Sequence, residues 1–462
     1  MHHNNSPWIK ELARTRSSVP VQKNLHTDVA IVGGGIAGVV TAYFTLTQTD
    51  KSVILLEADK VAHGATGHNA GQITSYFERP LPDIAREFGV DMAVDGQRNV
   101  EDAWGLLEKI IIETELDVAH YVFTGYAGVT TLAQLIPHLE SSRLRVDNKL
   151  FQETILVAQE WVGKEKIPER FKDLYSVVDQ SKILSQLESH NKDFIASLSY
   201  KKGCMNSAVF TEKLVQYLVK KFPRRFSFYE QSPVNVVNLF KIDAVLEVNE
   251  CRIRVKRVVL CTNGFEHFKI YNEAGTQINT QFHHSIEGLV GYMSAYVQSS
   301  NHDPIAISYF PKEAINKKTM LNDSYFYITR RPFEHEANKV HNLISIGGPD
   351  SELPESKQFV FDHEQVDKVN EAIDTFMKSS YNKYPSEDVE FVYSWQGLMG
   401  YTPNGIRRIG PEPCNEVLLY NLGCNGVGIL PSIFGGKRIA QLLNNEKIAP
   451  SIFDPHDQRE AN

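Results

Sequence analysis

The chain has 462 residues, which is too long for one compact core and predicts two or three domains' worth of mass. Its 42% apolar and 23% charged residues are typical of a globular enzyme, and a net charge of −8 argues against a nucleic-acid binder, which usually carries a basic stripe. Five widely spaced cysteines without a CxxC pair, and the lack of an apolar run of bilayer length, favour a cytoplasmic protein with reduced thiols, no metal site and no membrane span.

The first predicted elements form a strand–helix–strand unit. Residues 27–33 (TDVAIVG) contain a short apolar run followed by turn glycines, the pattern of a buried parallel strand. A helix from Ile36 to about residue 47 has small residues on its buried face, and residues 52–56 are a second β-rich run. Together these segments predict the short form of a βαβ crossover.

The loop between the first strand and the helix fits the GxGxxG pattern at residues 33–38. Gly33 permits the tight turn, Gly35 lets the backbone approach a pyrophosphate, and Gly38 lets helix and strand pack closely. The pyrophosphate would meet unpaired N–H groups at the positive end of the helix dipole. Glu57, at the end of the second strand, is placed to accept hydrogen bonds from a ribose and to repel a 2′-phosphate. The loop therefore predicts a dinucleotide and disfavours NADP.

A second glycine-rich passage, GATGHNAGQ at residues 64–72, follows soon after Glu57. Such a sequence lets the backbone pass close to a ligand again. This second passage predicts a ligand longer than the ADP half of a dinucleotide.

The middle of the chain alternates helix-like and strand-like patterns. A helical pattern covers residues 82–115, a strand is predicted at 119–131, and a polar, helix-prone stretch runs from 132 to 192. Further elements are a helix at 211–222 and strands at 226–230, 234–239, 244–248 and 252–260, the last leading into the sequence CTNG at 261–264.

The C-terminal part begins with strand-rich sequence and ends on a helix. Strands are predicted at 288–297, 325–330, 343–346 and 417–422, and helices at 362–378 and 431–443. Between the last strand and the last helix lies the turn LGCNGVG, residues 422–428. Its N–H groups can face the electron-rich edge of a flavin ring, where a helix N-terminus stabilises the negative charge of the reduced form.

Taken together, these segments resemble the D-amino-acid oxidase-type flavoenzymes, the group that includes glycine and sarcosine oxidases and γ-glutamylputrescine oxidase. The resemblance lies in DVAIVGGGIAGVVTAY, the LLE of the second strand, GATGHNAGQ, WQGLMGYTPNGIRRIGP and LGCNGVG. It covers residues 28–72, 226–264, 325–350 and 395–443. The GATGHN element is most similar to γ-glutamylputrescine oxidase.

The resemblance implies an α/β fold in which a Rossmann-like FAD-binding domain is interleaved with a mixed-sheet α+β substrate domain. The FAD-binding domain would comprise residues 24–95, 196–275 and 392–448; the substrate domain would comprise 96–195 and 276–391; residues 449–462 would be a tail.

The resemblance also implies FAD as the cofactor. The residues expected to contact it are Gly33, Gly35, Ile36, Ala37, Gly38, Glu57, Ala58, Gly64, Thr66, Gly67, His68, Asn69, Ala70, Gly71, Gln72, Val234, Thr262, Asn263, Gly397, Gly423, Asn425, Gly426, Val427 and Gly428. We expect non-covalent binding. The alternative is a covalent link through His68, whose position is similar to that of the flavin-linked histidine of dimethylglycine and sarcosine dehydrogenases.

The implied reaction is oxidation of a C–N bond in a small amine or amino acid, by hydride transfer to flavin N5 and hydrolysis of the resulting imine. Candidate catalytic residues are Tyr325, Tyr327, Arg330, Trp395 and Tyr401, and His283 and His284 are further candidates for the lining. A substrate carboxylate could meet Arg330, Arg331, Arg407 or Arg408.

Two alternatives stay open beside an oxidase that uses molecular oxygen. One is a flavin dehydrogenase that passes electrons to a quinone or protein acceptor. The other is a flavoprotein with a structural or assembly role and no turnover of its own. The sequence contains no HExxH, P-loop or GxSxG motif, so metalloprotease, kinase and hydrolase activities lack support.

Overall fold

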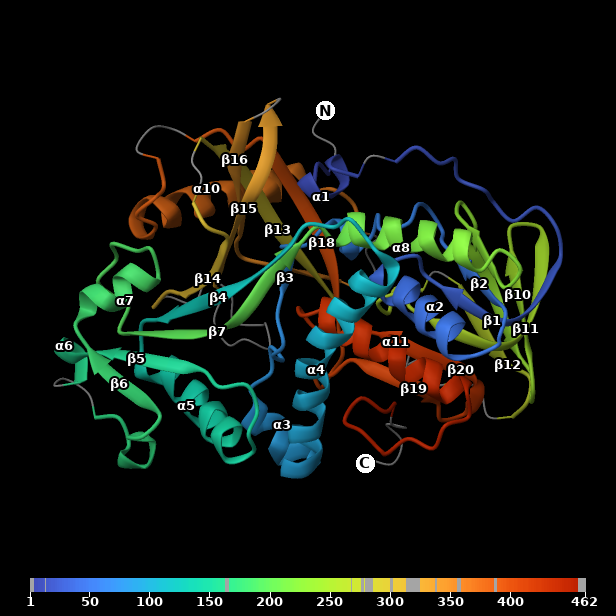
Figure 1. The fold of residues 1–462 in the computed structure, drawn as a ribbon, viewed down its shortest axis with the longest axis horizontal. Coiled ribbons are helices and arrows are strands. Elements are labelled where there is room, and N and C mark those ends of the chain that lie inside the picture. The colour runs from blue at the N-terminus through green and yellow to red at the C-terminus, as the bar shows by residue number, and fades with distance from the viewer. Residues whose placement is uncertain are drawn as a thin grey trace.

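The structure, a computed structural model, contains two mixed β-sheets that lie beside each other, with helices packed on their faces (Figure 1). The first sheet lies to the right in Figure 1 and the second to the left. The structure describes residues 4–12, 14–162, 166–266, 268–275, 278, 286–299, 302–312, 325–336, 339–354, 359–385 and 389–455.

The first sheet begins with the strand–helix–strand unit. Within the described residues it has nine strands: β12 (Lys269–Asn272), β9 (Val234–Leu239), β10 (Ala244–Val248), β11 (Cys251–Leu260), β1 (Leu25–Val32), β2 (Val53–Leu56) and β8 (Phe226–Tyr229) in that order, with β20 (Asn415–Leu422) paired to β11 and β19 (Arg408–Glu412) to β20. β1 runs parallel to β2 and β11, and β2 runs parallel to β8. The predicted βαβ unit is therefore confirmed.

Helices cover the face of the first sheet that is turned to the viewer in Figure 1. They are α2 (Ile36–Gln48), α8 (Ser207–Lys221), α11 (Ile429–Leu443) and the long α4 (Val90–Thr114). α2 and α11 approach each other at backbone distance, because a Cβ atom on Gly436 would lie only 3.0 Å from the backbone nitrogen of Thr41. This close packing places the N-termini of two helices at one edge of the sheet.

The second sheet is longer and more strongly mixed. Within the described residues it has eleven strands: β17 (Ser351–Leu353), β13 (Glu287–Gln298), β16 (Lys339–Gly347), β15 (Phe326–Glu336), β14 (Ile305–Phe310), β4 (His120–Val129), β7 (Ala196–Met205), β5 (Thr154–Ala158) and β6 (Tyr175–Val178) in that order, with β18 (Tyr393–Tyr401) paired to β13 and β3 (Gln72–Ile73) to β7. Its helices are α5 (Leu132–Asp147), α6 (Gln159–Val162), α7 (Gln180–Gln186) and α10 (His363–Ser380). Helix α3 (Leu81–Phe88) packs against α4 and α5, and its buried residues belong to the core of the first sheet. Three further short helices are α1 (Pro7–Lys10), η1 (Ala65–Gly67) and η2 (Glu169–Phe171).

The interleaved α/β fold class is confirmed, but the prediction of a helix-prone stretch at residues 132–192 was wrong in two places, although helices α5, α6 and α7 do lie within it. The segments 154–158 and 175–178 are strands β5 and β6. Both are short; β5 is buried at four of its five positions and β6 has no buried position, so neither shows the alternation of buried and exposed residues that marks a strand. Pairing with β7 fixes β5 in the sheet, and β5 in turn holds β6.

The strand pairing also bears on where the two domains divide. β7 and β18 belong to the second sheet, although the predicted boundaries at residues 196 and 392 assign them to the FAD-binding domain. Conversely, α4 packs into the core of the first sheet. We therefore propose that the boundaries lie near residues 116, 206 and 402, at the ends of these elements.

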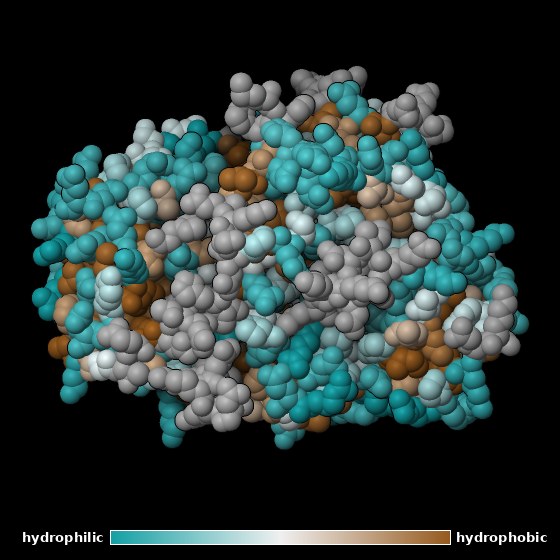
Figure 2. Space-filling view, turned by 180° about the vertical axis from the view of Figure 1, so that it is seen from behind, coloured by the Kyte–Doolittle hydropathy of each residue, from teal (hydrophilic) through white to brown (hydrophobic). Residues whose placement is uncertain are grey.

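Within the described part of the chain, the helices lack the combination of length and apolar character that a bilayer crossing requires. On the side opposite to that of Figure 1, the described surface is mainly hydrophilic and carries separate apolar patches (Figure 2). Single apolar side chains at the surface, such as Ile242, are ordinary in globular proteins.

Candidate functional site

A cavity of about 470 Å³ lies where the carboxyl edge of the first sheet meets the second sheet. The loops that follow β1, β2 and β11, the 64–72 passage, strands β15 and β18 and the turn before α11 all contribute to its lining. All but four of the predicted cofactor contacts line this cavity. The four that do not are Gly38, Gly67, Gly423 and Asn425.

The glycine loop has the backbone geometry that its sequence predicts. Gly33 has a φ of +110°, and a Cβ atom there would lie 2.6 Å from the carbonyl oxygen of Cys261. A Cβ on Gly38 would overlap the carbonyl oxygen of Gly33, so this glycine brings helix and strand together from behind the cavity. Gly35 caps the N-terminus of α2 and lines the cavity. A helix N-terminus that opens on a cavity in this way fits a pyrophosphate.

Glu57 lies at the end of β2 and points back toward the glycine loop. Its Oε2 accepts a hydrogen bond from the backbone N–H of Gly34 at 2.6 Å, and its Oε1 accepts one from Asp59 at 2.9 Å. Burial raises the pKa of the Glu57 carboxyl, and these two hydrogen bonds oppose that shift. Ser232 and Val234 line the same end of the cavity, which is therefore suited to an adenosine group.

Hydrogen bonds fix the 64–72 passage along the side of the cavity. Thr66 Oγ1 accepts from the N–H of Ile36 at 3.0 Å, which joins the passage to the first turn of α2. The Asn69 amide nitrogen donates to Ser207 Oγ at 2.9 Å, and its oxygen accepts from the N–H of Gly71 at 2.6 Å. Hydrogen bonds within the protein thus hold the passage in place as a wall of the cavity.

His68 lies in this wall and lines the cavity. Its Nδ1 lies 3.0 Å from the carbonyl oxygen of Gly64. Burial lowers the pKa of the His68 imidazole, although the backbone carbonyls around the ring favour the protonated form. The imidazole is therefore held in place and favoured in its neutral form.

The N-terminal segment, which the sequence reading did not assign to the site, supports this wall from outside. Trp8 is fully buried, and its indole N–H donates to the carbonyl oxygen of Asn69 at 2.5 Å. A Cβ atom on Gly71, which has a φ of +67°, would lie 2.5 Å from the Trp8 ring. Only glycine fits between the indole and the cavity at this position.

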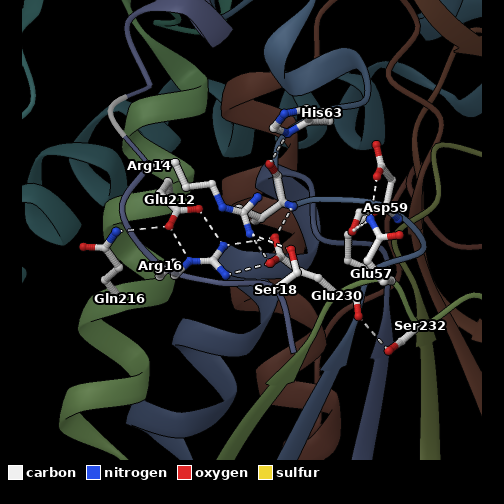
Figure 3. Close-up of polar contacts among 12 residues, drawn as sticks. Arg14, Arg16, Ser18, Glu57, Asp59, His63, Glu212, Gln216, Glu230 and Ser232 are labelled. Carbon is white, nitrogen blue, oxygen red and sulfur yellow. Dashed lines mark hydrogen bonds and ion pairs between the residues drawn. The ribbon is translucent and has the colours of Figure 1, made fainter. Parts of the chain in front are cut away.

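Farther along, ion pairs fix the same segment near the end of the cavity that Glu57 lines (Figure 3). Arg16 lies 2.7 Å from Glu230 and also pairs with Glu212, and Arg14 pairs with Glu230. Glu230 in turn accepts from the N–H of Val61 at 2.7 Å, which connects the segment to the loop after β2. Burial raises the pKa of Glu230, but the arginines and this hydrogen bond overcome it and keep the pKa below its ordinary value.

The turn before α11 closes the opposite end of the cavity. Gly426, Val427 and Gly428 line it, and α11 begins at the next residue, so a second helix N-terminus faces the cavity. Asn425, with a φ of +46°, supports the turn from behind, since its side-chain oxygen accepts from the N–H of Thr402 at 2.8 Å.

Three of the five candidate catalytic residues line the cavity: Tyr325, Tyr327 and Tyr401. Arg330 does not, because successive residues of a strand point to opposite faces and Arg330 differs from Tyr327 by an odd number of positions. It forms an ion pair with Glu188 at 2.6 Å on the other face. Trp395 is buried behind the lining, where its indole N–H donates to the carbonyl of Asn69 at 3.3 Å.

Of the arginines considered for a substrate carboxylate, only Arg407 lines the cavity. Its guanidinium is occupied, because Nε donates to Asn421 Oδ1 at 2.7 Å and Nη2 donates to the Asn421 carbonyl at 2.9 Å. Arg331 pairs with Glu11, away from the cavity. His283 and His284 lie outside the described residues.

Two carboxyl groups that the sequence reading missed face the cavity near the tyrosines. Glu78 Oε2 accepts from the Tyr401 hydroxyl at 2.6 Å, and its Oε1 accepts from Tyr325 at 3.5 Å. Burial raises the pKa of Glu78 to about 7, although the two hydroxyls lower it. Burial and the charge of Glu78 raise the pKa of Asp350 to about 8. Titratable groups perturbed in this way are common at functional sites.

Glu78 also lies directly against the turn before α11, since a Cβ atom on Gly426 would overlap its carboxyl group. A buried lysine, Lys202, stands behind the lining, where its Nζ donates to Gln72 Oε1 at 3.1 Å. Burial lowers the pKa of Lys202 to about 7. In the sequence, Glu78 is marked only by its aromatic neighbours in YFERP, which is too weak a signal to find it.

The family comparison agrees with this architecture. Residues 28–442 match the family model described as FAD dependent oxidoreductase. The chain belongs to this family. FAD dependence, which the resemblance implied, is thereby confirmed at the level of the family.

Two curated relatives match short stretches of the chain. A putative Rieske 2Fe-2S iron–sulfur protein, YhfW, from Bacillus subtilis (strain 168) is 32% identical over 97 residues, 21% of this chain and 19% of the relative. Gamma-glutamylputrescine oxidoreductase from Escherichia coli (strain K12) is 33% identical over 73 residues, 16% of this chain and 17% of the relative. The matched stretches span less than a fifth of either relative's length.

Solved structures share the fold over nearly the whole chain. Glycine oxidase from Geobacillus kaustophilus superposes with a TM-score of 0.65 at 15% identity, covering 93% of this chain and 98% of that one. L-α-Glycerophosphate oxidase from Mycoplasma pneumoniae, with FAD bound, gives a TM-score of 0.62 at 13% identity, covering 91% of this chain and 95% of that one. At these identities the likeness establishes the fold.

Proposed function

We propose that the protein oxidises the C–N bond of an amine, with FAD held non-covalently in the 470 Å³ cavity. The pyrophosphate would lie on Gly33, Gly35 and the N-terminus of α2, and the ribose against Glu57. The turn at residues 426–428 would face the flavin ring. When bound, FAD would supply the two-electron acceptor for a hydride from the carbon that bears the nitrogen, and water would hydrolyse the resulting imine.

The observation that supports an amine is the group formed by Glu78, Tyr325 and Tyr401. A carboxylate with two phenolic donors, next to the turn assigned to the flavin ring, is suited to hold a substrate ammonium. Glu78 then accepts the ammonium proton, which leaves the neutral amine that hydride release requires. Because the pKa of Glu78 is about 7, the carboxylate becomes available as the pH rises through neutrality.

The charges around the site favour an amine over an amino acid. Within the described part of the chain, Arg407 is the only Arg or Lys side chain in the lining, and it is occupied by Asn421. Besides Glu57 at the other end, the lining carboxyls are Glu78 and Asp350. The carboxylate of Glu78 attracts a cation and repels a carboxylate, and Asp350, whose pKa is raised to about 8, adds no positive charge. Glycine oxidase, named for an amino acid, and γ-glutamylputrescine oxidoreductase, named for an amine, both occur among the similar proteins.

The test is the pH dependence of kcat/KM for an amine that reduces the flavin. We expect the wild-type value to rise through about pH 7, with Tyr76, Tyr325, Tyr401 and Asp350 remaining protonated there because burial raises their pKa values. Glu78→Gln should remove this limb and lower the plateau by about 100-fold or more. The matched control is Glu108→Gln, at an exposed position of α4. An unchanged pH limb in Glu78→Gln would remove Glu78 from the mechanism.

A flavin dehydrogenase is the second candidate. The match to a protein named as a Rieske 2Fe-2S iron–sulfur protein favours it, because Rieske centres are one-electron carriers. Peroxide formation during turnover in air supports the oxidase, whereas reduced flavin that persists in air but is reoxidised by a quinone or an iron–sulfur protein supports the dehydrogenase.

The form of attachment has its own test. The neutral imidazole of His68 is at the cavity wall, so a covalent link is chemically open. We propose non-covalent binding, in which the imidazole stays beside the Gly64 carbonyl oxygen, 3.0 Å from Nδ1. Acid precipitation should release all yellow colour into the supernatant, and colour retained in the pellet that His68→Ala abolishes would establish the link.

A further inference from the structure

A second cavity of about 210 Å³ adjoins the first, and four residues line both: Tyr76, Glu78, Ser308 and Tyr325. It extends away from the turn assigned to the flavin ring, toward α3 and α5, which lie side by side below β4 and β7 in Figure 1. The share of liquid volume that one water occupies is about 30 Å³, so this cavity has room for a short substituent chain. Since Glu78 is shared, a group bound there continues directly into the second cavity.

The far wall of the second cavity contains a charged pair with free hydrogen-bonding capacity. Arg145 and Glu153 both line it, and Arg145 Nε lies 3.4 Å from Glu153 Oε1. Among the described residues, no donor reaches the buried Glu153 Oε2, and the equally buried Arg145 Nε donates to no acceptor. A buried oxygen of this kind is costly unless a donor reaches it, so the wall favours a ligand that supplies one.

The balance of charge decides which donor is favoured. Arg145 also pairs with Glu101 at 2.7 Å, and Arg79, the other arginine of the described lining, pairs with Glu87 at 2.5 Å. Each arginine is thus neutralised by a carboxylate outside the lining, which leaves the charges of Glu78 and Glu153 in excess. A carboxylate on the ligand would be repelled, whereas an amino or hydroxyl group would be attracted. His138, whose pKa burial lowers, adds no positive charge.

We propose that this second cavity binds the tail of the substrate, and that the substrate is an elongated amine whose far end carries a hydrogen-bond donor. The reacting nitrogen lies at Glu78, the chain passes between Tyr76 and Tyr325, and the distal amino or hydroxyl group donates to Glu153 Oε2. The assignment of the reacting end rests on the proposed function.

The test compares amines of equal length on the FAD-loaded protein. The probes are n-alkylamines, α,ω-diamines, amino alcohols and ω-amino acids of three to six carbons, with ethylamine as the short reference. Dissociation constants come from the concentration dependence of anaerobic flavin reduction, and from calorimetry for any probe that leaves the flavin oxidised. We expect diamines or amino alcohols to bind about tenfold or more tightly than the alkylamine of the same length, and ω-amino acids to bind weakest.

Two variants locate the effect in the second cavity. Ser141→Phe places a ring in the lining on α5 and should reduce the preference for the donor-ended chain at least tenfold. The matched control is Val146→Phe, at an exposed position of the same helix (43% exposed), which should retain the preference. Glu153→Gln, a smaller change, should lower the preference for diamines in particular.

The outcomes separate this inference from the proposed function. If ethylamine reduces the flavin but the end group has no effect, or Ser141→Phe leaves the preference intact, the tail site is refuted and amine oxidation stands. If donor-ended chains bind in a manner sensitive to Ser141→Phe without reducing the flavin, the tail site stands and amine oxidation is refuted. If no probe binds or reduces the flavin, both are refuted.

Discussion

Replacement of Gly33 by alanine should strain the glycine loop where it packs against Cys261. The φ of +110° belongs to a region that side chains rarely adopt, which costs about 1–3 kcal/mol. The added Cβ would lie 2.6 Å from the Cys261 carbonyl oxygen, so the two strands must separate by several tenths of an ångström to restore contact at 3.4 Å. That strain adds about 1–3 kcal/mol. We expect Gly33→Ala to lower the free energy of unfolding by about 2–6 kcal/mol and to lose FAD.

Gly35→Val supplies the contrast. Gly35 has an ordinary φ of −76°, and in the described part of the chain its Cβ would meet only Thr66 Oγ1, at 3.0 Å. The folded protein should therefore tolerate the change with a cost of about 1 kcal/mol or less, while the valine methyl groups enter the space assigned to the pyrophosphate. We expect near-normal stability of the FAD-free protein and strongly reduced FAD content.

The assay is urea unfolding of the FAD-free proteins together with the ratio of FAD to protein after reconstitution. Gly105→Ala is the control, because Gly105 lies in the interior of α4 and its Cβ would have no described residue within 4 Å. Alanine is favoured over glycine in a helix by about 0.5–1 kcal/mol, so this control should gain stability and retain FAD. A Gly33→Ala protein that is as stable as the wild type, or a Gly35→Val protein that is fully loaded with FAD, would refute this placement of the loop.

Three further predictions concern the surroundings of the cavity. Trp8→Ala should lower the free energy of unfolding by about 3–5 kcal/mol in urea and speed FAD release, because it removes the fully buried indole behind Gly71. Glu230→Gln should cost about 3 kcal/mol by leaving Arg16 with one carboxylate fewer, measured against Glu108→Gln as a control. Lys202→Met should be more stable than the wild type by roughly 3–5 kcal/mol below pH 7. Between the folded pKa of about 7 and the ordinary 10.5, only the unfolded chain keeps the lysine proton, so wild-type stability rises with pH and the advantage shrinks. Equal advantages at pH 6 and pH 9 would contradict this sign.

The glycine loop could be predicted from the sequence because its determinants are local. Gly33, Gly35 and Gly38 lie within six residues, and the strand before them and the helix after them have clear periodicity. The structure confirms that strand, helix and second strand in order. Short-range geometry of this kind leaves few alternatives.

The substrate side could not be predicted, because its determinants are far apart in the chain. Glu78 becomes a functional candidate only through Tyr325 and Tyr401, which lie more than two hundred residues away. Arg330 was a reasonable catalytic candidate by type, but its partner Glu188 belongs to a different element and the strand turns it to the other face. Likewise, nothing in the sequence near Trp8 indicates that it packs behind Gly71.

The most direct test of the central claim is the visible spectrum of the purified protein, recorded before and after anaerobic addition of a broad amine panel. We predict a flavin spectrum whose chromophore is FAD, and bleaching of that spectrum by at least one amine. A colourless protein that cannot be reconstituted with FAD would contradict the cofactor assignment, and a yellow protein that no amine bleaches would contradict the proposed reaction.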